Sequence, residues 1–133
     1  MNPSAAIKDK KWVILVVDDE EDMLTLMQIK LKAEGFDVEI SPNAENILDI
    51  VWQHPPDVIL LDISIAGVDG GTVCRLLKTN KSTVNIPILM VSGNPNIGSV
   101  ARTCGADGYI AKPFDIKEVK EKICEALEGN VAR

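Results

Sequence analysis

The sequence predicts an α/β fold in which five parallel strands alternate with five helices, a doubly wound (βα)5 three-layer sandwich. Two observations lead to this prediction. Unbroken apolar runs with β-branched residues recur along the chain, and such runs are typical of strands buried on both faces of a parallel sheet. Segments with apolar residues at helical spacing separate these runs. An alternation of strands and helices implies helices on both faces of the sheet, joined by right-handed crossovers.

The clearest strand covers residues 58–62, where four apolar residues end in the carboxylate of Asp62. It starts behind Pro55-Pro56 and ends before a loop that contains three glycines. The other predicted strands cover residues 12–17, 38–40, 86–91 and 109–111. The strand at 38–40 alternates apolar and charged residues, which indicates that one of its faces is exposed.

Helices are predicted between the strands, because apolar residues recur there every three or four positions. The apolar positions that define four of them are Met23, Met27 and Leu31; Ile47, Leu48 and Val51; Val73, Leu76 and Leu77; and Ile116, Val119, Ile123 and Leu127. Gly35 is predicted to cap the end of the first helix. The short fourth helix is predicted to begin with Asn94 as N-cap and Pro95 as first residue, and to end at Cys104. Asp115 and Glu118 have capping-box spacing at the start of the last helix.

Length and composition fit a single domain, since the chain has 133 residues of which 46% are hydrophobic. We expect it to span residues 12–128, between a flexible N-terminal tail, 1–11, and a C-terminal tail, 129–133. The formal net charge of −6 argues against nucleic-acid binding by the domain itself. No apolar run approaches the roughly 20 residues of a membrane span, and the polar N-terminus does not resemble a signal peptide. We therefore expect a cytoplasmic protein without a membrane partner.

Cysteine and histidine usage excludes several kinds of site. Cys74, Cys104 and Cys124 form no C-x-x-C pair, so we expect reduced thiols that pack in the fold rather than a disulfide framework. His54 is the only histidine, which excludes a histidine-based metal cluster and a Ser-His catalytic pair. We expect His54 to lie on the surface at a helix end.

Polar residues stand where the predicted strands end. Asp18 and Asp19 follow the first strand, Asp62 ends the third, Ser92 follows the fourth and Lys112 follows the fifth. Because parallel strands end at one edge of the sheet, where α/β proteins build their sites, we expect these side chains to converge. Each residue alone has an ordinary interpretation as a turn residue, a cap or part of an acidic first helical turn. Their joint occurrence at four strand ends favours a site.

Three clustered carboxylates repel each other, by on the order of 4 kcal/mol for a pair about 4 Å apart at an effective dielectric of about 20. Lys112 would offset part of this repulsion, and a divalent cation would offset more. Oxygen ligands without histidine or thiolate suit Mg²⁺. A carboxylate beside Mg²⁺, a lysine and a hydroxyl has the groups that phosphoryl transfer needs, and its attack on phosphorus would give an aspartyl phosphate.

The sequence resembles the receiver domain of two-component response regulators over about residues 12–128. The motifs that carry the resemblance are Ile14-Leu-Val-Val-Asp-Asp-Glu20, Asp57-Val-Ile-Leu-Leu-Asp62, Asp69-Gly70, Val91-Ser92-Gly93 and Gly105-Ala-Asp-Gly-Tyr-Ile-Ala-Lys-Pro-Phe114. The resemblance implies the strand order 2-1-3-4-5. It also implies a role in a phosphorelay, in which a histidine kinase or phosphotransfer protein donates a phosphoryl group to Asp62. The domain would then be no enzyme toward other molecules, and would catalyse only its own phosphorylation and dephosphorylation.

The same resemblance implies the metal ligands. Asp19 and Asp62 would bind Mg²⁺ directly, and Asp18 would act largely through water. The backbone carbonyl of Ser64 would complete the set of protein ligands.

The resemblance further implies how the phosphoryl group is sensed. Ser92 would bond a phosphoryl oxygen, Lys112 would pair with the phosphoryl group, and Pro113 would follow a cis peptide bond. Tyr109 matches the family's switch aromatic, which turns inward on activation. Output would pass to an unknown partner through the face made by the fourth helix, the fifth strand and the last helix.

Several positions depart from the family pattern. Ile65-Ala66 replace the usual Met-Pro, which should loosen the loop after Asp62 without removing a reacting group. Ser64 and Asn94 occupy positions that tune the lifetime of the phosphate in the family. Gly98 should weaken the fourth helix by about 1 kcal/mol relative to alanine.

Other functions fit the sequence less well. An Mg²⁺-dependent phosphatase with an aspartyl nucleophile generally needs a second acidic residue two positions on, where Ser64 stands. An FMN-binding flavodoxin-like protein would need a Ser/Thr/Gly-rich loop in place of Asp18-Asp19. Asp62 and Lys112 argue against a pseudo-receiver that only binds partners. We expect a stand-alone regulator or the receiver part of a longer one, as a monomer or a phosphorylation-dependent homodimer.

Overall fold

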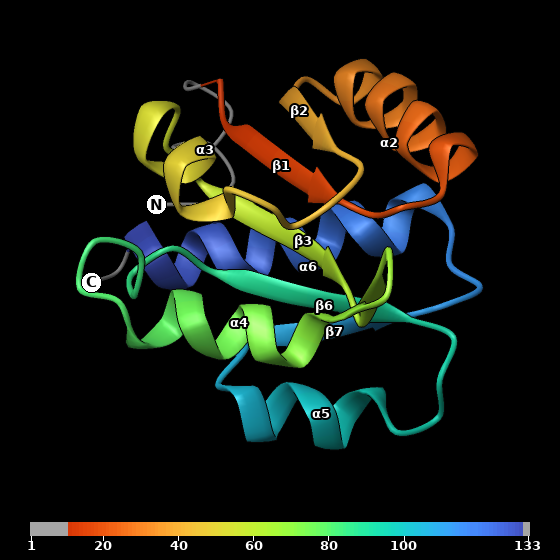
Figure 1. Ribbon diagram of the computed structural model, residues 1–133. Helices are drawn as coiled ribbons and strands as arrows, with labels where there is room; N and C mark the ends of the chain where they lie inside the picture. The colour runs from red at the N-terminus through yellow and green to blue at the C-terminus, as the bar shows by residue number, and fades with distance from the viewer. Residues whose placement is uncertain (1–10, 132–133) are drawn as a thin grey trace.

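Five parallel strands form the central sheet in the order β2-β1-β3-β6-β7 (Figure 1). The strands are β1 (Val13–Val17), β2 (Asp37–Ser41), β3 (Val58–Asp62), β6 (Ile88–Ser92) and β7 (Gly108–Ala111). This computed structural model describes residues 11–131. When the strands of this sheet are counted along the chain, the order is the implied 2-1-3-4-5, so the fold class is confirmed.

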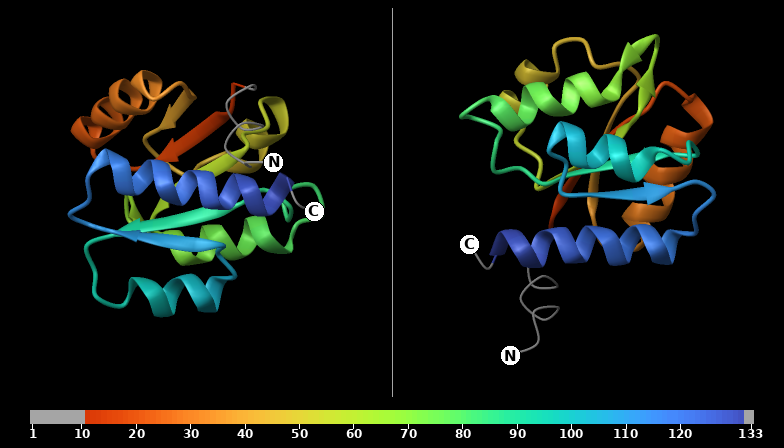
Figure 2. Two further views of the ribbon diagram at one scale, coloured as in Figure 1. Left: turned by 180° about the vertical axis from the view of Figure 1, so that it is seen from behind. Right: turned by 90° about the horizontal axis from the view of Figure 1, so that it is seen from below.

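Helices cover both faces of the sheet, as the views in Figure 2 show. The helices α2 (Glu21–Ala33) and α6 (Ile116–Val131) lie on one face. The helices α3 (Ile47–Gln53), α4 (Gly70–Thr79) and α5 (Ile97–Cys104) lie on the other. The alternating strands and helices predicted from the sequence therefore form the three layers.

Two hydrophobic cores lie on either side of the sheet, because side chains of a strand alternate between its faces. On β1, Ile14 and Val16 pack toward α2 and α6, whereas Leu15 and Val17 pack toward the other three helices. All five residues of β3 are buried, so this central strand is held on both faces. Its last residue, Asp62, therefore belongs to the fully buried middle strand of the sheet.

A two-stranded antiparallel hairpin follows β3 and was not predicted from the sequence. Its strands are β4 (Ser64–Ile65) and β5 (Val68–Asp69). Ile65 is fully buried in the core and both strands of the hairpin are paired, and the expected loosening of this segment by the loss of proline stays a prediction.

Several predicted helix ends are confirmed and others are corrected. Gly35 follows α2 with φ of 97°, and the N–H of Glu118 donates to Asp115 Oδ1 at 2.8 Å at the start of α6. The predicted N-cap Asn94 is wrong: α5 begins at Ile97, and Asn94 Oδ1 instead accepts from the N–H of Asn96 at 2.8 Å in the preceding turn.

The termini and surface agree in part with the expectations. Residues 1–10 and 132–133 of the predicted tails lie outside the described residues. The helix α6 continues to Val131, so positions 129–131 of the predicted C-terminal tail are helical. His54 is exposed and follows the end of α3, as expected. Within residues 11–131, every helix is too short or too polar to cross a membrane.

Candidate functional site

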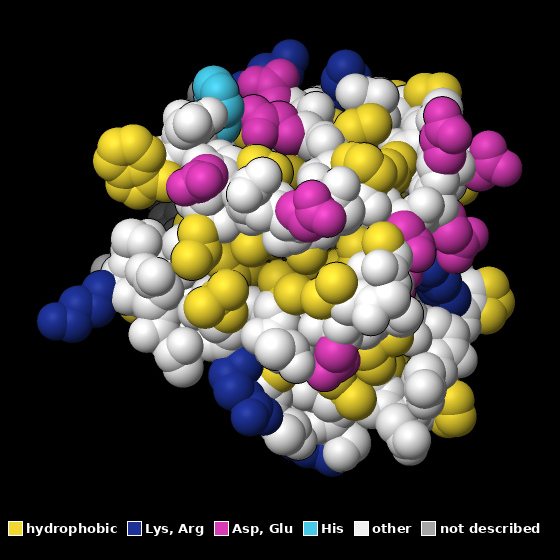
Figure 3. Space-filling model, viewed as in Figure 1, with side chains coloured by type: hydrophobic (Ala, Val, Ile, Leu, Met, Phe, Trp, Pro, Cys, Tyr) yellow, Lys and Arg dark blue, Asp and Glu magenta, His cyan; other side chains and the backbone are white. Residues whose placement is uncertain are grey.

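Three carboxylates meet at the edge of the sheet where the strands end. β1 pairs with β3 so that Val17 stands opposite Leu61, which places Asp18 beside Asp62. One carboxylate oxygen from each of Asp18, Asp19 and Asp62 lies within 4.8 Å of the other two. Asp18 and Asp62 are buried, whereas Asp19 is exposed. The space-filling view shows acidic side chains gathered along this edge (Figure 3).

Lys112 brings positive charge to this carboxylate cluster. It follows β7, and its backbone N–H donates to the carbonyl of Ser92 at 2.9 Å. Its Nζ lies 3.6 Å from Asp18 Oδ2 and 3.8 Å from Glu20 Oε1, a partner that the sequence analysis missed. The peptide bond between Lys112 and Pro113 is cis, as the resemblance implies. The single ammonium group of Lys112 thus compensates only part of the charge of the surrounding carboxylates, and the site keeps an excess of negative charge.

The pKa of Asp62 is raised above its ordinary value, chiefly because burial disfavours the ionised carboxylate. Lys112 lowers this pKa, and the N–H of Ile63, 2.9 Å from Oδ1, also lowers it. The negative charges of Asp18 and Asp19 raise it. The ionised form of Asp62 is therefore only partly compensated by the protein, and a cation between the carboxylates would favour it.

The donor set of the cluster fits Mg²⁺. All three groups offer carboxylate oxygens, and the cluster contains no histidine or cysteine from the described residues. Hard oxygen ligands that leave room for water are those that Mg²⁺ prefers. Asp18, Asp19 and Asp62 could therefore hold this ion together.

Ser92 lies next to the cluster, whereas Tyr109 lies outside it. Asp62 stands opposite Val91 in the sheet, so Ser92 is one residue beyond this pair. Ser92 is buried, and its Oγ accepts from the N–H of Asn94 at 3.0 Å. Tyr109 is 45% exposed and lies over α5, where a Cβ added to Gly98 would be 3.4 Å from ring atoms Cε1 and Cζ.

The hairpin brings a further group to the site. Ser64, in β4, pairs with Asp69 and has an exposed side chain. At the hairpin tip, the backbone N–H of Ala66 donates to Asp19 Oδ2 at 2.8 Å. Ala66 and Gly67 both have positive φ, 51° and 82°, as in a type I′ turn. The sequence did not signal this contact, because a positive φ is uncommon for alanine.

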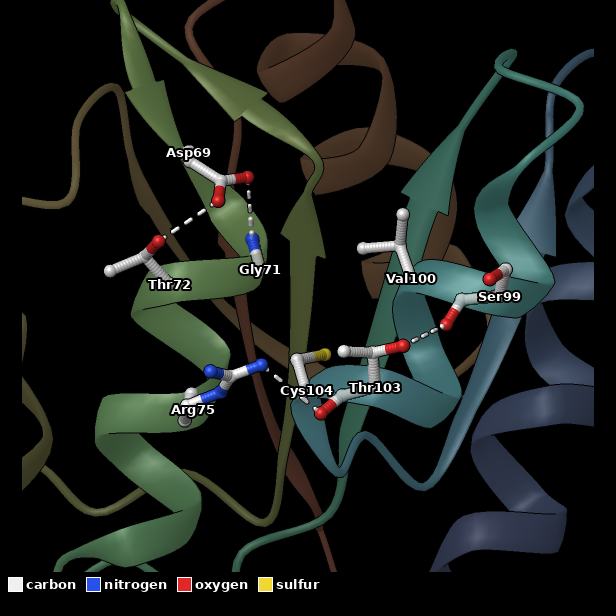
Figure 4. Close-up of a pocket in the computed structure, with 8 residues that line it drawn as sticks. All are labelled: Asp69, Gly71, Thr72, Arg75, Ser99, Val100, Thr103 and Cys104. Atoms are coloured by element: carbon white, nitrogen blue, oxygen red, sulfur yellow. Dashed lines mark hydrogen bonds between the residues drawn. The ribbon is translucent and has the colours of Figure 1, made fainter.

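A separate cavity of about 360 Å³ lies between α4 and α5 (Figure 4). On its wall, Arg75 Nη2 donates to the carbonyl of Thr103 at 3.3 Å. At its rim, Asp69 caps α4 by accepting from the N–H of Gly71 at 3.2 Å and from Thr72 Oγ1 at 2.9 Å. None of the predicted site residues lines this cavity, but the cap fixes the second strand of the hairpin to α4.

Comparison with known proteins shows which proteins this chain is similar to. The family model described as response regulator receiver domain matches residues 14–124. The chain is 34% identical over 112 residues to the DNA-binding dual master transcriptional regulator RpaA of Synechocystis sp.. That match covers 83% of this chain and 46% of RpaA, so the chain spans less than half of the relative's length.

Solved structures agree with the family match. The receiver domain of NtrX from Brucella abortus has a TM-score of 0.78 at 33% identity, with 86% of this chain and 98% of that chain covered. The chemotaxis protein CheY4 of Vibrio cholerae has a TM-score of 0.81 at 22% identity, with 89% of this chain and 100% of that chain covered. At this lower identity the second likeness shows the fold alone.

Proposed function

This chain belongs to the family of response regulator receiver domains, and we propose that its Asp62 accepts a phosphoryl group in an Mg²⁺-dependent reaction. The donor is the phosphohistidine of a histidine kinase or phosphotransfer protein. One observation carries the proposal: Asp62 ends the buried central strand and lies within 4.8 Å of two further carboxylates. The buried strand fixes the position of the nucleophilic carboxylate, and the two neighbouring carboxylates create negative charge that a cation would compensate.

In the proposed reaction an oxygen of ionised Asp62 attacks phosphorus. The P–N bond to the donor histidine breaks, its electron pair stays on the imidazole nitrogen, and the imidazole takes up a proton from solvent. The N–H of Ile63 holds Oδ1 of Asp62 at 2.9 Å and so orients the nucleophile. Phosphoryl transfer depends mostly on positioning and on compensation of charge, which fits a domain with few reacting groups.

The acidic cluster would hold the metal. Asp19 and Asp62 would bind Mg²⁺ directly, Asp18 would act largely through water, and the backbone carbonyl of Ser64 would complete the protein ligands. When bound, Mg²⁺ compensates the charge of the cluster and of the incoming phosphoryl oxygens. The oxygen-only donor set and the raised pKa of Asp62 support this assignment.

Two residues would contact the phosphoryl group on Asp62 and so distinguish the phosphorylated protein from the unmodified one. Lys112, whose Nζ is 3.6 Å from Asp18 Oδ2, would pair with the phosphoryl group. Ser92 accepts one hydrogen bond from Asn94, and a hydroxyl that accepts can still donate its own hydrogen, here to a phosphoryl oxygen. Movement of Ser92 toward Asp62 would vacate space into which the ring of Tyr109 can turn.

The domain would act through partners rather than on substrates. It would catalyse only its own phosphorylation and dephosphorylation, and would control an output protein through the face made by α5, β7 and α6. The net charge of −6 supports a domain that does not itself bind nucleic acid, although its relative RpaA, of which the match covers 46%, is a DNA-binding regulator. We further propose a cytoplasmic location, and a monomer or a homodimer that forms on phosphorylation.

The test is incubation of the protein with a small phosphodonor such as phosphoramidate, with Mg²⁺ or with excess EDTA. The expected result is a mass increase of one phosphoryl group that requires Mg²⁺ and is absent from Asp62→Asn. An unmodified wild-type protein in Mg²⁺, or equal modification of Asp62→Asn, would refute the proposal.

A further inference from the structure

Asp19 is the member of the acidic cluster with the least support from the sheet. Its side chain is exposed, and the charges of Asp18 and Asp62 repel it. The ammonium of Lys112 lies near Asp18 and Glu20, and neither of its ion pairs involves Asp19. An exposed carboxylate in this position can reduce the repulsion by rotating away from the cluster. A hydrogen-bond donor is therefore needed to keep it in place.

Among the described residues, the donor to Asp19 is the backbone N–H of Ala66, 2.8 Å from Oδ2. A hydrogen bond to an ionised acceptor is among the stronger kinds. Ala66 has a φ of 51°, and residues other than glycine seldom adopt this backbone conformation. The contact with the carboxylate offsets the disfavoured conformation, so the two features belong to one arrangement.

The hairpin that carries Ala66 is fixed at its base. Ile65 is fully buried, and the N–H of Gly70 donates to the carbonyl of Ile63 at 2.7 Å. Asp69 caps α4 through Gly71, with the N–H 3.2 Å from Oδ1. The amide at the tip is therefore held at a defined place relative to the ends of β1 and β3.

We propose that Ala66 is a positioning residue of the metal site. Its amide holds one oxygen of Asp19, so that the carboxylate stays within the cluster and keeps its other oxygen for Mg²⁺. The inference rests on the proposed function, which makes Asp19 a metal ligand. A proline at this position has no N–H and fixes φ near −65°, so it could not make the contact. The departure from the family pattern at position 66 thus changes how the metal site is organised in this chain.

The test compares Mg²⁺ dissociation constants, measured by calorimetry, for the wild-type protein, Ala66→Gly and Ala66→Pro. Glycine keeps the N–H and accommodates a positive φ, so Ala66→Gly is the matched control and should bind like the wild type. Ala66→Pro loses the donor and should bind about tenfold more weakly, as is typical when a group that orients a metal ligand is removed. Equal affinity of wild type and Ala66→Pro, or equal weakening by both substitutions, would overturn the inference.

A semisynthetic variant separates the hydrogen bond from the backbone conformation. Lactate in place of Ala66 changes the amide into an ester, which keeps the methyl group, replaces the N–H by an oxygen and leaves the carbonyl of Ile65 as a weaker acceptor. This variant should bind Mg²⁺ about as weakly as Ala66→Pro, and wild-type affinity would overturn the inference. Absence of Mg²⁺ binding by the wild-type protein would instead refute the metal site of the proposed function, so the two failures are distinguishable.

Discussion

The backbone carbonyl oxygen of Asp62 occupies the space that a side chain on Gly70 would need. A Cβ added to Gly70 would overlap this oxygen and lie 2.9 Å from the Cα of Ile63. Gly70 is the first residue of α4, and its N–H donates to the Ile63 carbonyl at 2.7 Å. The glycine therefore allows the start of a helix to pack against the backbone of Asp62, the proposed phosphoacceptor.

Replacement of Gly70 by alanine should lower the free energy of unfolding by about 1–3 kcal/mol, because overpacking forces the backbone to shift. Gly129→Ala is the matched control: nothing lies within 4 Å of its Cβ position in α6, and alanine there should raise the stability by up to about 1 kcal/mol. Urea unfolding measures both effects. A Gly70→Ala protein as stable as the wild type would contradict the close approach of the two backbones.

Asp62→Asn should stabilise the metal-free protein near neutral pH. Burial raises the pKa of Asp62 in the folded state, so the unfolded chain ionises more readily than the folded one. The stability linked to this group is fully present below the unfolded pKa and is lost as the pH rises through the folded pKa. Asp62→Asn should therefore melt a few degrees above the wild type at about pH 7 in EDTA, and the difference should shrink toward about pH 3.

Mg²⁺ provides the control for this effect, because it compensates the charge that the substitution removes. The melting temperatures of wild type and Asp62→Asn should lie closer together in Mg²⁺ than in EDTA. An Asp62→Asn protein that melts at or below the wild type in EDTA near neutral pH would show that the cluster is not repulsive.

Lys112→Arg should keep the phosphorylation of Asp62 and weaken the conformational response. Arginine retains the positive charge, but its planar guanidinium does not reproduce the compact ammonium that lies 3.6 Å from Asp18 Oδ2. Intact mass after incubation with phosphoramidate measures the first step, and NMR shifts of the modified protein measure the second. Loss of both together would assign Lys112 to the transfer step instead.

Much of this arrangement could be predicted from the sequence. Apolar runs and, at 38–40, an alternating pattern identified the strands of the sheet, and polar residues at four strand ends indicated the edge where Asp18, Asp62 and Lys112 meet. These features follow from burial and from strand direction, which leave a clear pattern in a single sequence.

Features of the backbone could not be predicted in the same way. The hairpin depends on a positive φ at Ala66, which no residue preference indicates, and on its contact with Asp19, a residue distant in the chain. Asn94 has the residue type of an N-cap, yet its side chain accepts from the N–H of Asn96 in the turn before α5, which begins only at Ile97. The first case depends on a contact between distant residues, and the second on a local choice between a turn and a helix cap.

The switch should be visible as a local change in NMR shifts. Beryllofluoride with Mg²⁺, which mimics the phosphoryl group, should shift signals from Ser92 through Tyr109 and leave residues 47–51 of α3 nearly unchanged. The physical reason is that Ser92 accepts a hydrogen bond from Asn94 in the loop before α5, and that the ring of Tyr109 lies over Gly98 in the same helix. Shifts centred on α3 with Tyr109 unmoved would show that the output passes by another route.

Chemical mapping of the modified protein shows directly whether Asp62 is the phosphoacceptor. The protein is phosphorylated with phosphoramidate and Mg²⁺, reduced with borohydride, which converts an aspartyl phosphate into homoserine, and sequenced by mass spectrometry. We expect homoserine at position 62 and loss of the phosphoryl group in hydroxylamine. A hydroxylamine-resistant phosphate on Ser64 or Ser92, with Asp62 unmodified, would contradict it.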